Sequence, residues 1–156
     1  METTRHFTAS VYLVNDGAVA LHRHQRLDLL LPAGGHVDRD ELPHETALRE
    51  AREETGLEPT LLGDAPDIAS GTNRSLPQPR HLMLADVNVH GDQVGHQHVD
   101  HVYYATVEER GIDPAPDEAP AEAWDWYDRT ALGSPSVDED VRELGREAIG
   151  VAAGRE

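Results

Sequence analysis

Three glutamates at helical spacing are the residues of this chain best placed to do chemistry. Glu50, Glu53 and Glu54 would share one face of a helix, because positions three and four apart are neighbours there. Like charges at this spacing destabilise an exposed helix by roughly a few tenths of a kcal/mol per pair. Arg49, four residues from both Glu45 and Glu53, is placed to offset part of this repulsion. A divalent cation would reverse it, and hard oxygen ligands in a chain without Cys favour Mg²⁺ or Mn²⁺.

An acidic surface is the alternative explanation for the same residues. The chain has 30 Asp and Glu against 13 basic residues, all of them Arg, and a net charge of −17. Such a surface is what we expect of a protein kept soluble in a very salty cytosol, where screening weakens self-repulsion. A solvated surface predicts acids scattered around the helix. Here three acids converge within one turn and Glu41 lies in the preceding loop, so the spacing favours a site.

The composition excludes several classes of protein. The negative charge argues against duplex nucleic acid as a partner, because phosphate contacts depend on Lys and Arg. The lack of Cys rules out disulfides and thiolate metal sites. No apolar run approaches the roughly 20 residues of a membrane span, and the N-terminus lacks the apolar stretch of a signal peptide. We therefore expect one cytoplasmic domain over residues 1–156 with no membrane partner.

The helix that carries the glutamates has well-marked ends. We expect it over residues 43–55, because a Pro occupies its first position and Gly56 suits the left-handed position past its last turn. Leu42 stands where a capping side chain is usual. Asp40 or Glu41 is therefore expected to bond the free amides of the first turn.

Apolar patterning predicts strands on both sides of this helix. Asn15-Asp16-Gly17 between two apolar runs is a hairpin signal, and a third strand would stop at Pro32, before a turn at Gly34-Gly35. The expected elements are strands over 6–14, 18–24 and 27–31, the helix, a short strand within 57–69, strands over 80–89, 99–109 and 122–128, and a helix over 137–152, with polar loops at 90–97 and 110–121. This order predicts an α/β fold in which helices pack on a mixed sheet.

The polar residues of the helix and the loop before it match a known motif. Gly35, Glu41, Arg49-Glu50-Ala51, Glu53-Glu54 and Gly56-Leu57 occur at the spacing of the Nudix box, with Ala51 smaller than the aliphatic residue common there. On these residues the chain resembles the Nudix (MutT-like) hydrolase family. The resemblance implies an α/β/α sandwich with a mixed β-sheet, in agreement with the independent order of strands and helices.

The resemblance also implies roles for individual residues. Glu50, Glu53 and Glu54 would bind the metal, with a backbone carbonyl near Gly34 adding a further ligand. Arg49 would orient a metal-binding or catalytic glutamate and completes the expected catalytic set. Supporting roles fall to the remaining residues of the motif, namely Gly35, Glu41 and Gly56.

The implied reaction is attack of water on a nucleoside diphosphate linked to another group, with Mg²⁺ or Mn²⁺ as cofactor. Several carboxylates must converge, because the metal ions neutralise the diphosphate and lower the pKa of a bound water. Glu118 and Glu122 on a later loop are candidates for the proton acceptor, although that loop equally suits a solvated acidic surface. The partner would be a nucleotide-derived small molecule, and a homodimer is expected from the family alone.

A catalytically silent domain of the same family is the alternative function. Such a domain would bind a nucleotide as a sensor without hydrolysing it. An intact set of three carboxylates favours the enzyme, because a binding module need not retain them all.

A second polar cluster lies in the segment that precedes residue 101. His96, His98 and Asp100 fall on one side of an extended strand. They would line the substrate cleft, or be polar residues on a half-exposed strand in which Asp100 fixes a His tautomer, or hold a second metal. Given the motif, the cleft is the favoured interpretation.

Two arginines and two tryptophans complete the candidates. Arg23 and Arg26 precede the glycine pair and would meet substrate phosphate in the cleft, with charge balance on an edge strand as the alternative. Trp124 and Trp126 alternate on one face of the last strand. Stacking on a base is one role for them, but core packing is the simpler explanation.

Overall fold

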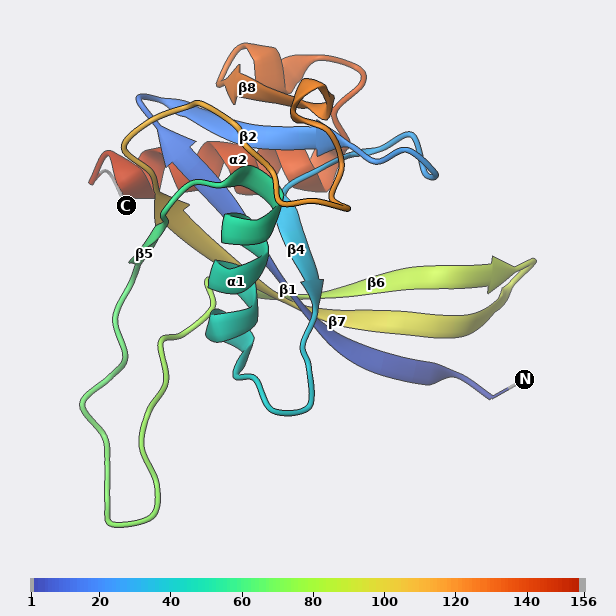
Figure 1. Ribbon diagram of the computed structural model, residues 1–156. Coiled ribbons are helices and arrows are strands. Elements are labelled where there is room, and N and C mark those ends of the chain that lie inside the picture. Colours follow the sequence, from blue (N-terminus) through green and yellow to red (C-terminus); the bar gives the residue numbers. More distant parts are fainter. Residues whose placement is uncertain (1, 155–156) are drawn as a thin grey trace.

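Two long strands run parallel through the middle of the sheet in this computed structural model, which describes residues 2–154 (Figure 1). They are β1 (Thr4–Asn15) and β7 (Gln93–Thr106). A parallel pair needs a long crossover connection, and here that connection contains the glutamate helix. The central pair therefore brings residues from the two halves of the chain side by side.

The other strands extend this pair in antiparallel directions. A tight turn at Asp16 and Gly17, both with positive φ, joins β1 to β2, so the predicted hairpin is confirmed. β4 pairs with β1, β3 and β8 pair with β2, and β5 and β6 pair with β7. Their bounds are β2 (Ala18–Arg23), β3 (Leu30–Leu31), β4 (Ala33–His36), β5 (Thr60–Leu62), β6 (His81–His90) and β8 (Trp124–Asp128), with 3-10 helices η1 (Ala121–Ala123) and η2 (Ala131–Gly133) on either side of β8.

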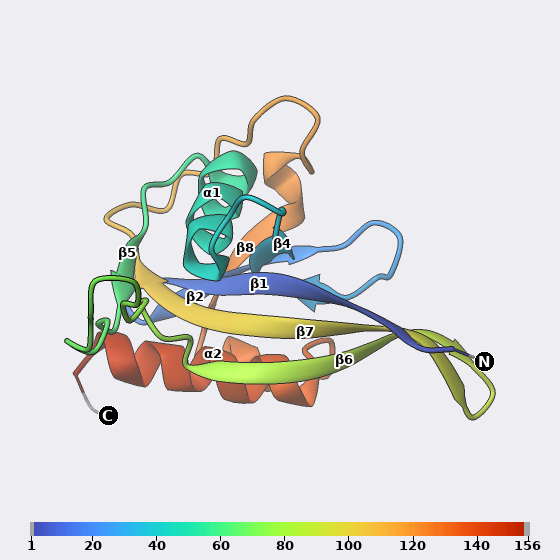
Figure 2. The same ribbon diagram turned by 90° about the horizontal axis from the view of Figure 1, so that it is seen from below.

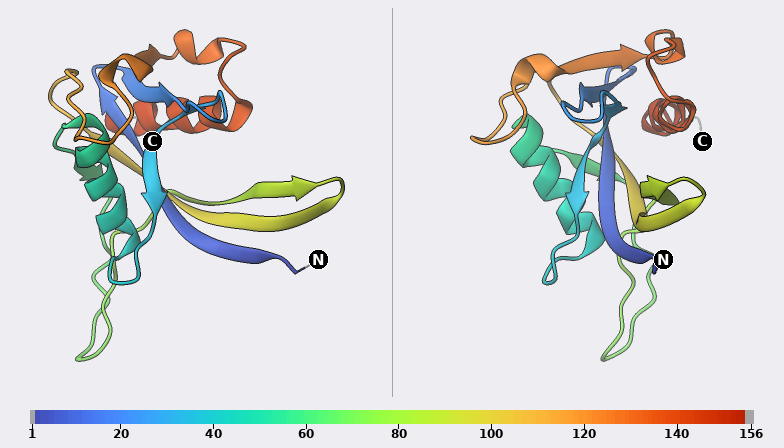
Figure 3. Two further views of the ribbon diagram at one scale, coloured as in Figure 1. Left: turned by 45° about the vertical axis from the view of Figure 1, so that its right-hand side comes forward. Right: turned by 90° about the vertical axis from the view of Figure 1, so that its right-hand side faces the viewer.

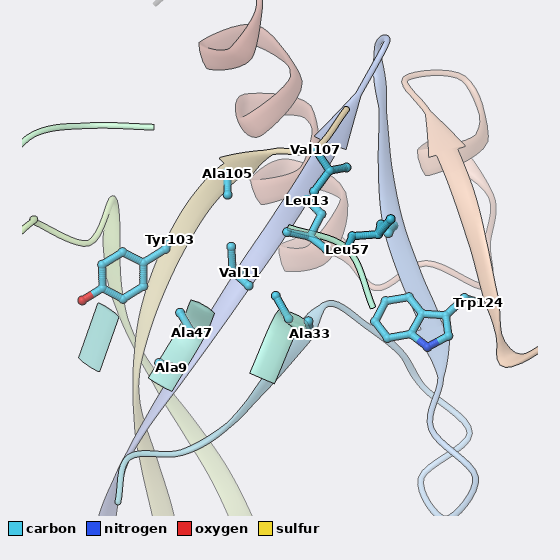
Figure 4. Packing of buried hydrophobic residues seen from close by; sticks show 12 residues of the cluster. Ala9, Val11, Leu13, Ala33, Ala47, Leu57, Tyr103, Ala105, Val107 and Trp124 are labelled. Carbon is cyan, nitrogen blue, oxygen red and sulfur yellow. The ribbon is translucent and has the colours of Figure 1, made fainter. Parts of the chain in front are cut away.

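One helix packs on each face of the sheet (Figure 2). α1 (Pro43–Thr55) packs on one face, where its alanines meet alternate residues of β1 (Figure 4), namely Ala9, Val11 and Leu13. α2 (Glu139–Ala152) packs on the other face against the intervening residues Tyr12 and Val14. Alternation along β1 therefore supplies two cores. The α/β/α sandwich with a mixed sheet is confirmed.

The start of α1 is capped in a way that the sequence did not predict. The Leu42 N–H donates to the Glu45 carboxylate at 2.9 Å. The prediction that Asp40 or Glu41 caps the helix is therefore wrong, because Glu45 accepts the bond from the start of the helix. Its expected pairing with Arg49 is wrong as well, because the Glu45 carboxylate is turned toward the start of the helix, and the structure pairs Arg49 with other acids.

The end of α1 is held by the acidic loop that follows β7. Gly56 has a φ of 73°, and its N–H donates to the Arg52 carbonyl, as expected of a helix C-terminus. A Cβ at Gly56 would collide with the backbone carbonyl of Asp113. Asp113 and Ala115 donate their N–H groups to carbonyls of the last turn of α1, each at 2.8 Å. These contacts fix the loop beside the glutamates.

Two predicted loops are strands in the structure. The expected turn at Gly34-Gly35 is wrong, because both residues are extended within β4 and face Ser10 and Ala9 of β1. The expected polar loop at 90–97 is also wrong, because β6 continues to His90 and β7 begins at Gln93. The two strands form a hairpin with a short turn. His96 and Gln97 therefore belong to the sheet.

The β6–β7 hairpin and the first half of β1 extend beyond both helices (Figure 3). Large apolar side chains on this extension are exposed to solvent, among them Phe7, Leu82 and Leu84. Within residues 2–154, no helix combines the length and the apolar character that crossing a membrane requires.

Candidate active site

The last two turns of α1 lie against the glycines of β4. Glu54 accepts a hydrogen bond from the Gly34 N–H at 2.9 Å. The Glu50 carboxyl group lies over Gly35, where an added Cβ would come within 2.8–3.2 Å of its atoms. Only a residue without a side chain leaves Glu50 this position. The motif therefore needs glycine here for close approach, since neither Gly34 nor Gly35 has a positive φ.

Arg49 ties three acidic residues of the motif together. Its Nε and Nη2 donate to the two carboxylate oxygens of Glu41 at 2.6 and 2.9 Å, a bidentate pair. Its Nη1 donates to Glu50 at 2.7 Å and to Glu53 at 3.1 Å. The hydrogen bonds that Arg49 donates to Glu41 lower the pKa of Glu41 to about 2. Glu41 therefore stays a carboxylate and holds Arg49 in place. The guanidinium is thereby aimed at Glu50 and Glu53.

Glu54 and Glu50 form a pair that resists ionisation. The pKa of Glu54 is raised to about 8, first by burial and then by the charges of Glu50 and Glu118, against the opposing effect of the Gly34 N–H. Burial also raises the pKa of Glu50, against the effect of Arg49. Two carboxyl groups in such proximity favour a shared proton unless a cation neutralises them. The pair is thus chemically poised for a positive ion.

The donor set fits a hard divalent cation. Val37 donates its N–H to the Phe7 carbonyl, so by alternation Gly34 occupies a non-hydrogen-bonded position opposite Ser10. Its carbonyl therefore points away from β1, to the side from which its N–H meets Glu54. Carboxylates and a backbone carbonyl are ligands that suit Mg²⁺ and Mn²⁺. In the part of the chain that is described, no three acidic or histidine side chains already form a closed ligand group, so Glu53 would have to turn inward.

A cleft of about 400 Å³ opens beside this pair. Its walls bring together seven of the predicted site residues, namely Gly34, Gly35, Glu50, Glu54, His98, Asp100 and Glu118. Glu118 enters from the loop that α1 holds, and its charge acts on both Glu50 and Glu54. Glu122 lines a separate hollow of about 460 Å³, so the two candidate proton acceptors are not equivalent.

Asp100 is held by two hydroxyl groups of the neighbouring strand. Thr8 Oγ1 donates to one carboxylate oxygen at 2.9 Å and Ser10 Oγ to the other at 2.8 Å. Among the described residues Asp100 accepts from Thr8 and Ser10 and has no hydrogen bond with a histidine, so the structure gives no support to the suggestion that Asp100 fixes a His tautomer. His98 lines the cleft, and His96 lies beside it without reaching the cleft wall.

The arginines before β3 lie at the edge of the site. Arg23 pairs with Asp28 at 2.9 Å, as the charge-balance alternative expects. Arg23 and Arg26 border an adjoining hollow that shares His22, His24 and Glu118 with the cleft. Both are thus near the cleft without lining it.

His22 is a site residue that the sequence did not predict. Its ring stacks on Trp124 at 4.5 Å between centroids, and its Nε2 lies 4.0 Å from Glu54. Burial lowers the pKa of His22 to about 4, so it is neutral near pH 7. Its buried Nδ1 has no hydrogen-bond partner among residues 2–154. Trp124 is buried as core packing predicts, and Trp126 is partly buried against the same core.

Comparisons with known proteins agree with this arrangement. The NUDIX domain family matches residues 4–148. A probable DHNTP pyrophosphohydrolase of Lactococcus lactis subsp. cremoris is 32% identical over 114 residues, which are 68% of this chain and 60% of that protein. A NUDIX family hydrolase from Clostridium perfringens is 33% identical, with a TM-score of 0.82 over 94% of this chain and 97% of that one.

A third relative is similar in fold alone. The dihydroneopterin triphosphate pyrophosphohydrolase of E. coli has a TM-score of 0.60 at 15% identity and covers 92% of both chains. The family match spans nearly the whole described chain and includes every residue of the glutamate motif. This chain belongs to the NUDIX domain family.

Proposed function

We propose that this protein is a Mg²⁺- or Mn²⁺-dependent hydrolase that cleaves a phosphoanhydride bond in a nucleoside diphosphate linked to another group. The observation that carries the proposal is the partly buried pair of Glu50 and Glu54, whose pKa values are raised and which open onto a cleft. Ionisable groups with strongly shifted pKa values are typical of catalytic sites, so two carboxyl groups that oppose each other's ionisation favour an enzyme over a binding module.

The chain's own residues would hold the metal ions and align the substrate. Glu50, Glu53, Glu54 and the Gly34 carbonyl are the ligands, and bound metal would supply charge neutralisation of the diphosphate and a more acidic water. Arg49 keeps Glu50 in position through Nη1 while Glu41 anchors its other nitrogens, and Glu53, which contacts the same Nη1, would turn inward to bind the metal. Catalysis on this scheme is mostly positioning of charge.

Glu118 is the proposed proton acceptor. It lines the same cleft as Glu50 and Glu54, whereas Glu122 lines another hollow. The hydrogen bonds of Asp113 and Ala115 to α1 hold the segment that carries Glu118. The charge of Glu118 raises the pKa of both Glu50 and Glu54, so it acts directly on two of the proposed metal ligands.

The substrate class is proposed from the curated relative. That protein is named as acting on DHNTP, and this chain spans 60% of its length. Dihydroneopterin triphosphate, a pterin compound that shares the phosphoanhydride but is not a nucleotide, is therefore the first compound to test, as an extension of the proposed class. Oxidised nucleoside triphosphates, ADP-ribose, sugar nucleotides and dinucleoside polyphosphates share the phosphoanhydride and complete the panel.

The test is a hydrolysis panel in high salt with Mg²⁺, with Glu53→Gln and an EDTA series as controls. We expect wild-type protein to split at least one compound into a monophosphate and a second phosphorylated product, such as pyrophosphate from a triphosphate, and Glu53→Gln to be slower by about 100-fold or more. If wild type and mutant were equally inactive on every compound while still binding one, a nucleotide sensor would replace the enzyme.

Glu118→Gln and Glu122→Gln form a matched pair for the proton acceptor. Loss of a general base costs about 10²- to 10⁴-fold in kcat, so Glu118→Gln is expected to fall in this range and lose the acid limb of the pH–rate profile. Glu122→Gln is expected to keep the wild-type kcat and the acid limb of the profile. An unchanged pH profile in Glu118→Gln would exclude Glu118 from this role.

A further inference from the structure

Four histidines from three strands gather on one face of the sheet. His6 lies on β1, His36 ends β4, and His96 and His98 lie on β7. The strand register explains the gathering, because His6 faces His98 across the parallel pair while Thr8, two residues on, faces His36. Side chains of alternate and directly opposite residues share a face. Only the last two of these histidines are adjacent enough in sequence to be noticed together.

The four rings form a closed circuit of contacts. The ring centroids of His6 and His96 are 4.6 Å apart, those of His96 and His98 5.1 Å, those of His98 and His36 4.9 Å, and those of His36 and His6 5.5 Å. Each ring meets its neighbours nearly at right angles, with interplanar angles of 75–87°. No core surrounds His6 and His36, which are exposed, so packing does not explain the circuit.

The surroundings of His98 favour its neutral form. The pKa of His98 is lowered, first by burial and then by His36, His96 and His6, because a charge on one ring opposes a charge on the others. A neutral imidazole presents one nitrogen as an acceptor or metal ligand. The carboxylate that acts on His98 is Asp100, which already accepts from Thr8 and Ser10.

One ring is already oriented from outside the circuit. Thr4 Oγ1 and His96 Nδ1 lie 2.7 Å apart, within hydrogen-bond distance. Such an outer contact fixes the ring and leaves Nε2 for another partner, which is the arrangement typical of metal-binding histidines.

We propose that His6, His36, His96 and His98 form a second metal site that takes a borderline-soft divalent ion of the Zn²⁺ class, separate from the carboxylate site. Zn–N distances of about 2.0–2.1 Å place the centroids of two imidazoles on one tetrahedral ion about 5 Å apart. The four neighbouring pairs of the circuit, at 4.6–5.5 Å, are close to this spacing. Imidazole ligands suit Zn²⁺, Cu²⁺ and Ni²⁺, whereas the oxygen ligands of α1 suit Mg²⁺.

The rings must turn for the nitrogens to converge. Within residues 2–154, no three such side chains are already arranged to hold an ion, since the rings meet edge to face. Rotation about the Cα–Cβ and Cβ–Cγ bonds is open to His6 and His36, whose side chains face solvent. Because His36 and His98 also line the cleft, a bound ion would place a positive charge on its wall.

Co²⁺ is the probe, because its visible absorption reports tetrahedral nitrogen ligation, and Zn²⁺ competes with it. The full chain is titrated in excess Mg²⁺, which occupies the carboxylate site. We expect one Co²⁺ per chain, displaced by one Zn²⁺, and a loss of affinity of about 10-fold or more in His98→Gln and in His6→Gln. His90→Gln, at the exposed tip of the same hairpin, is the matched control and keeps wild-type affinity.

Two further variants separate this site from the proposed catalytic one. Glu54→Gln is expected to keep Co²⁺ binding, and circular dichroism without metal checks that each variant is folded. Co²⁺ binding that is lost in Glu54→Gln, or retained in both His98→Gln and His6→Gln, would overturn the histidine site. Neither outcome depends on whether the protein hydrolyses any compound, so the two proposals fail independently.

Discussion

At the scale of single residues, Glu54 carries a carboxyl group whose charged form is disfavoured by its surroundings. Its carboxyl group is mostly buried, accepts one backbone N–H and faces two other acids, Glu50 and Glu118. Without a cation it is most stable with its proton on. The metal-free protein therefore tolerates at Glu54 a group that the proposed function needs in the charged form.

The first prediction concerns the pH dependence of stability. The folded-state pKa of Glu54 is about 8 against about 4.5 for an ordinary Glu. The stabilising contribution of the bound proton is thus complete below pH 4.5 and is lost as the pH rises toward 8. In EDTA, Glu54→Gln, which mimics the protonated form, should melt about 4 °C or more above wild type at pH 8.5.

The measurement is a series of thermal melts between pH 5 and pH 9. The difference in Tm should shrink toward pH 5, and Mg²⁺ should raise the Tm of wild type more than that of Glu54→Gln. Glu122→Gln, which removes an exposed carboxylate, is the control and should show no such trend. A gap between Glu54→Gln and wild type that does not vary with pH would contradict the assignment of this pKa.

At the scale of elements, β4 shows why neighbouring glycines have different roles. A Cβ at Gly34 would lie 2.5 Å from the Ala9 carbonyl, a backbone atom that cannot move aside. A Cβ at Gly35 would instead meet the Glu50 side chain at 2.8 Å. The first glycine is needed for strand pairing and the second for the position of a metal-binding carboxylate.

The second prediction follows from this difference. Gly35→Ala should fold with a Tm close to that of wild type but lose about 10-fold or more in Mg²⁺-dependent kcat, because Glu50 is displaced. Gly34→Ala should be destabilised by about 1–3 kcal/mol, because the strands must separate. Melts and hydrolysis rates on both variants check this, with Gly71→Ala, which meets no atom within 4 Å, as control. Equal losses of Tm in the two variants would contradict it.

The elements also show what the sequence can and cannot predict. The ends of α1 and the β1–β2 hairpin are local features set by Pro, Gly and Asp-Gly, and both are confirmed. The predicted Gly34-Gly35 turn is wrong, because Gly34 allows close approach to β1 and Gly35 close approach to Glu50, and neither residue forms a turn. The four-histidine circuit was out of reach, because its members meet through a strand register that no local pattern specifies.

At the scale of the whole molecule, the net charge of −17 is the dominant property. The arginines pair locally with acids, as Arg52 does with Glu58 and Arg23 with Asp28, so most of the excess charge is left to repel across the surface. Salt shortens the range of this repulsion from about 10 Å at 0.1 M to about 3 Å at 1 M. We therefore expect salt to stabilise the folded state.

The third prediction is a rise in Tm of about 5 °C or more between 0.1 and 2 M KCl at pH 7.5, because compact charge is screened more than the charge of the extended chain. Differential scanning calorimetry measures it. The same series at pH 4.5 is an internal control, because many carboxylates are then protonated and the rise should be smaller. A slope that is equal at the two pH values would mean that salt acts through something other than this charge.

The parallel pairing of β1 with β7 has a consequence for the speed of folding. Their paired residues lie 92 positions apart, and the intervening chain contains α1, β2 and the long connection to β6. Closing so large a loop costs entropy before any contact rewards it, which makes non-local parallel pairing slow. The β1–β2 hairpin and α1 can form early. Asp100 and His98 take their places in the wall of the cleft only after β7 has paired with β1. Competence for binding should therefore appear in refolding together with the slowest phase, well after the helices.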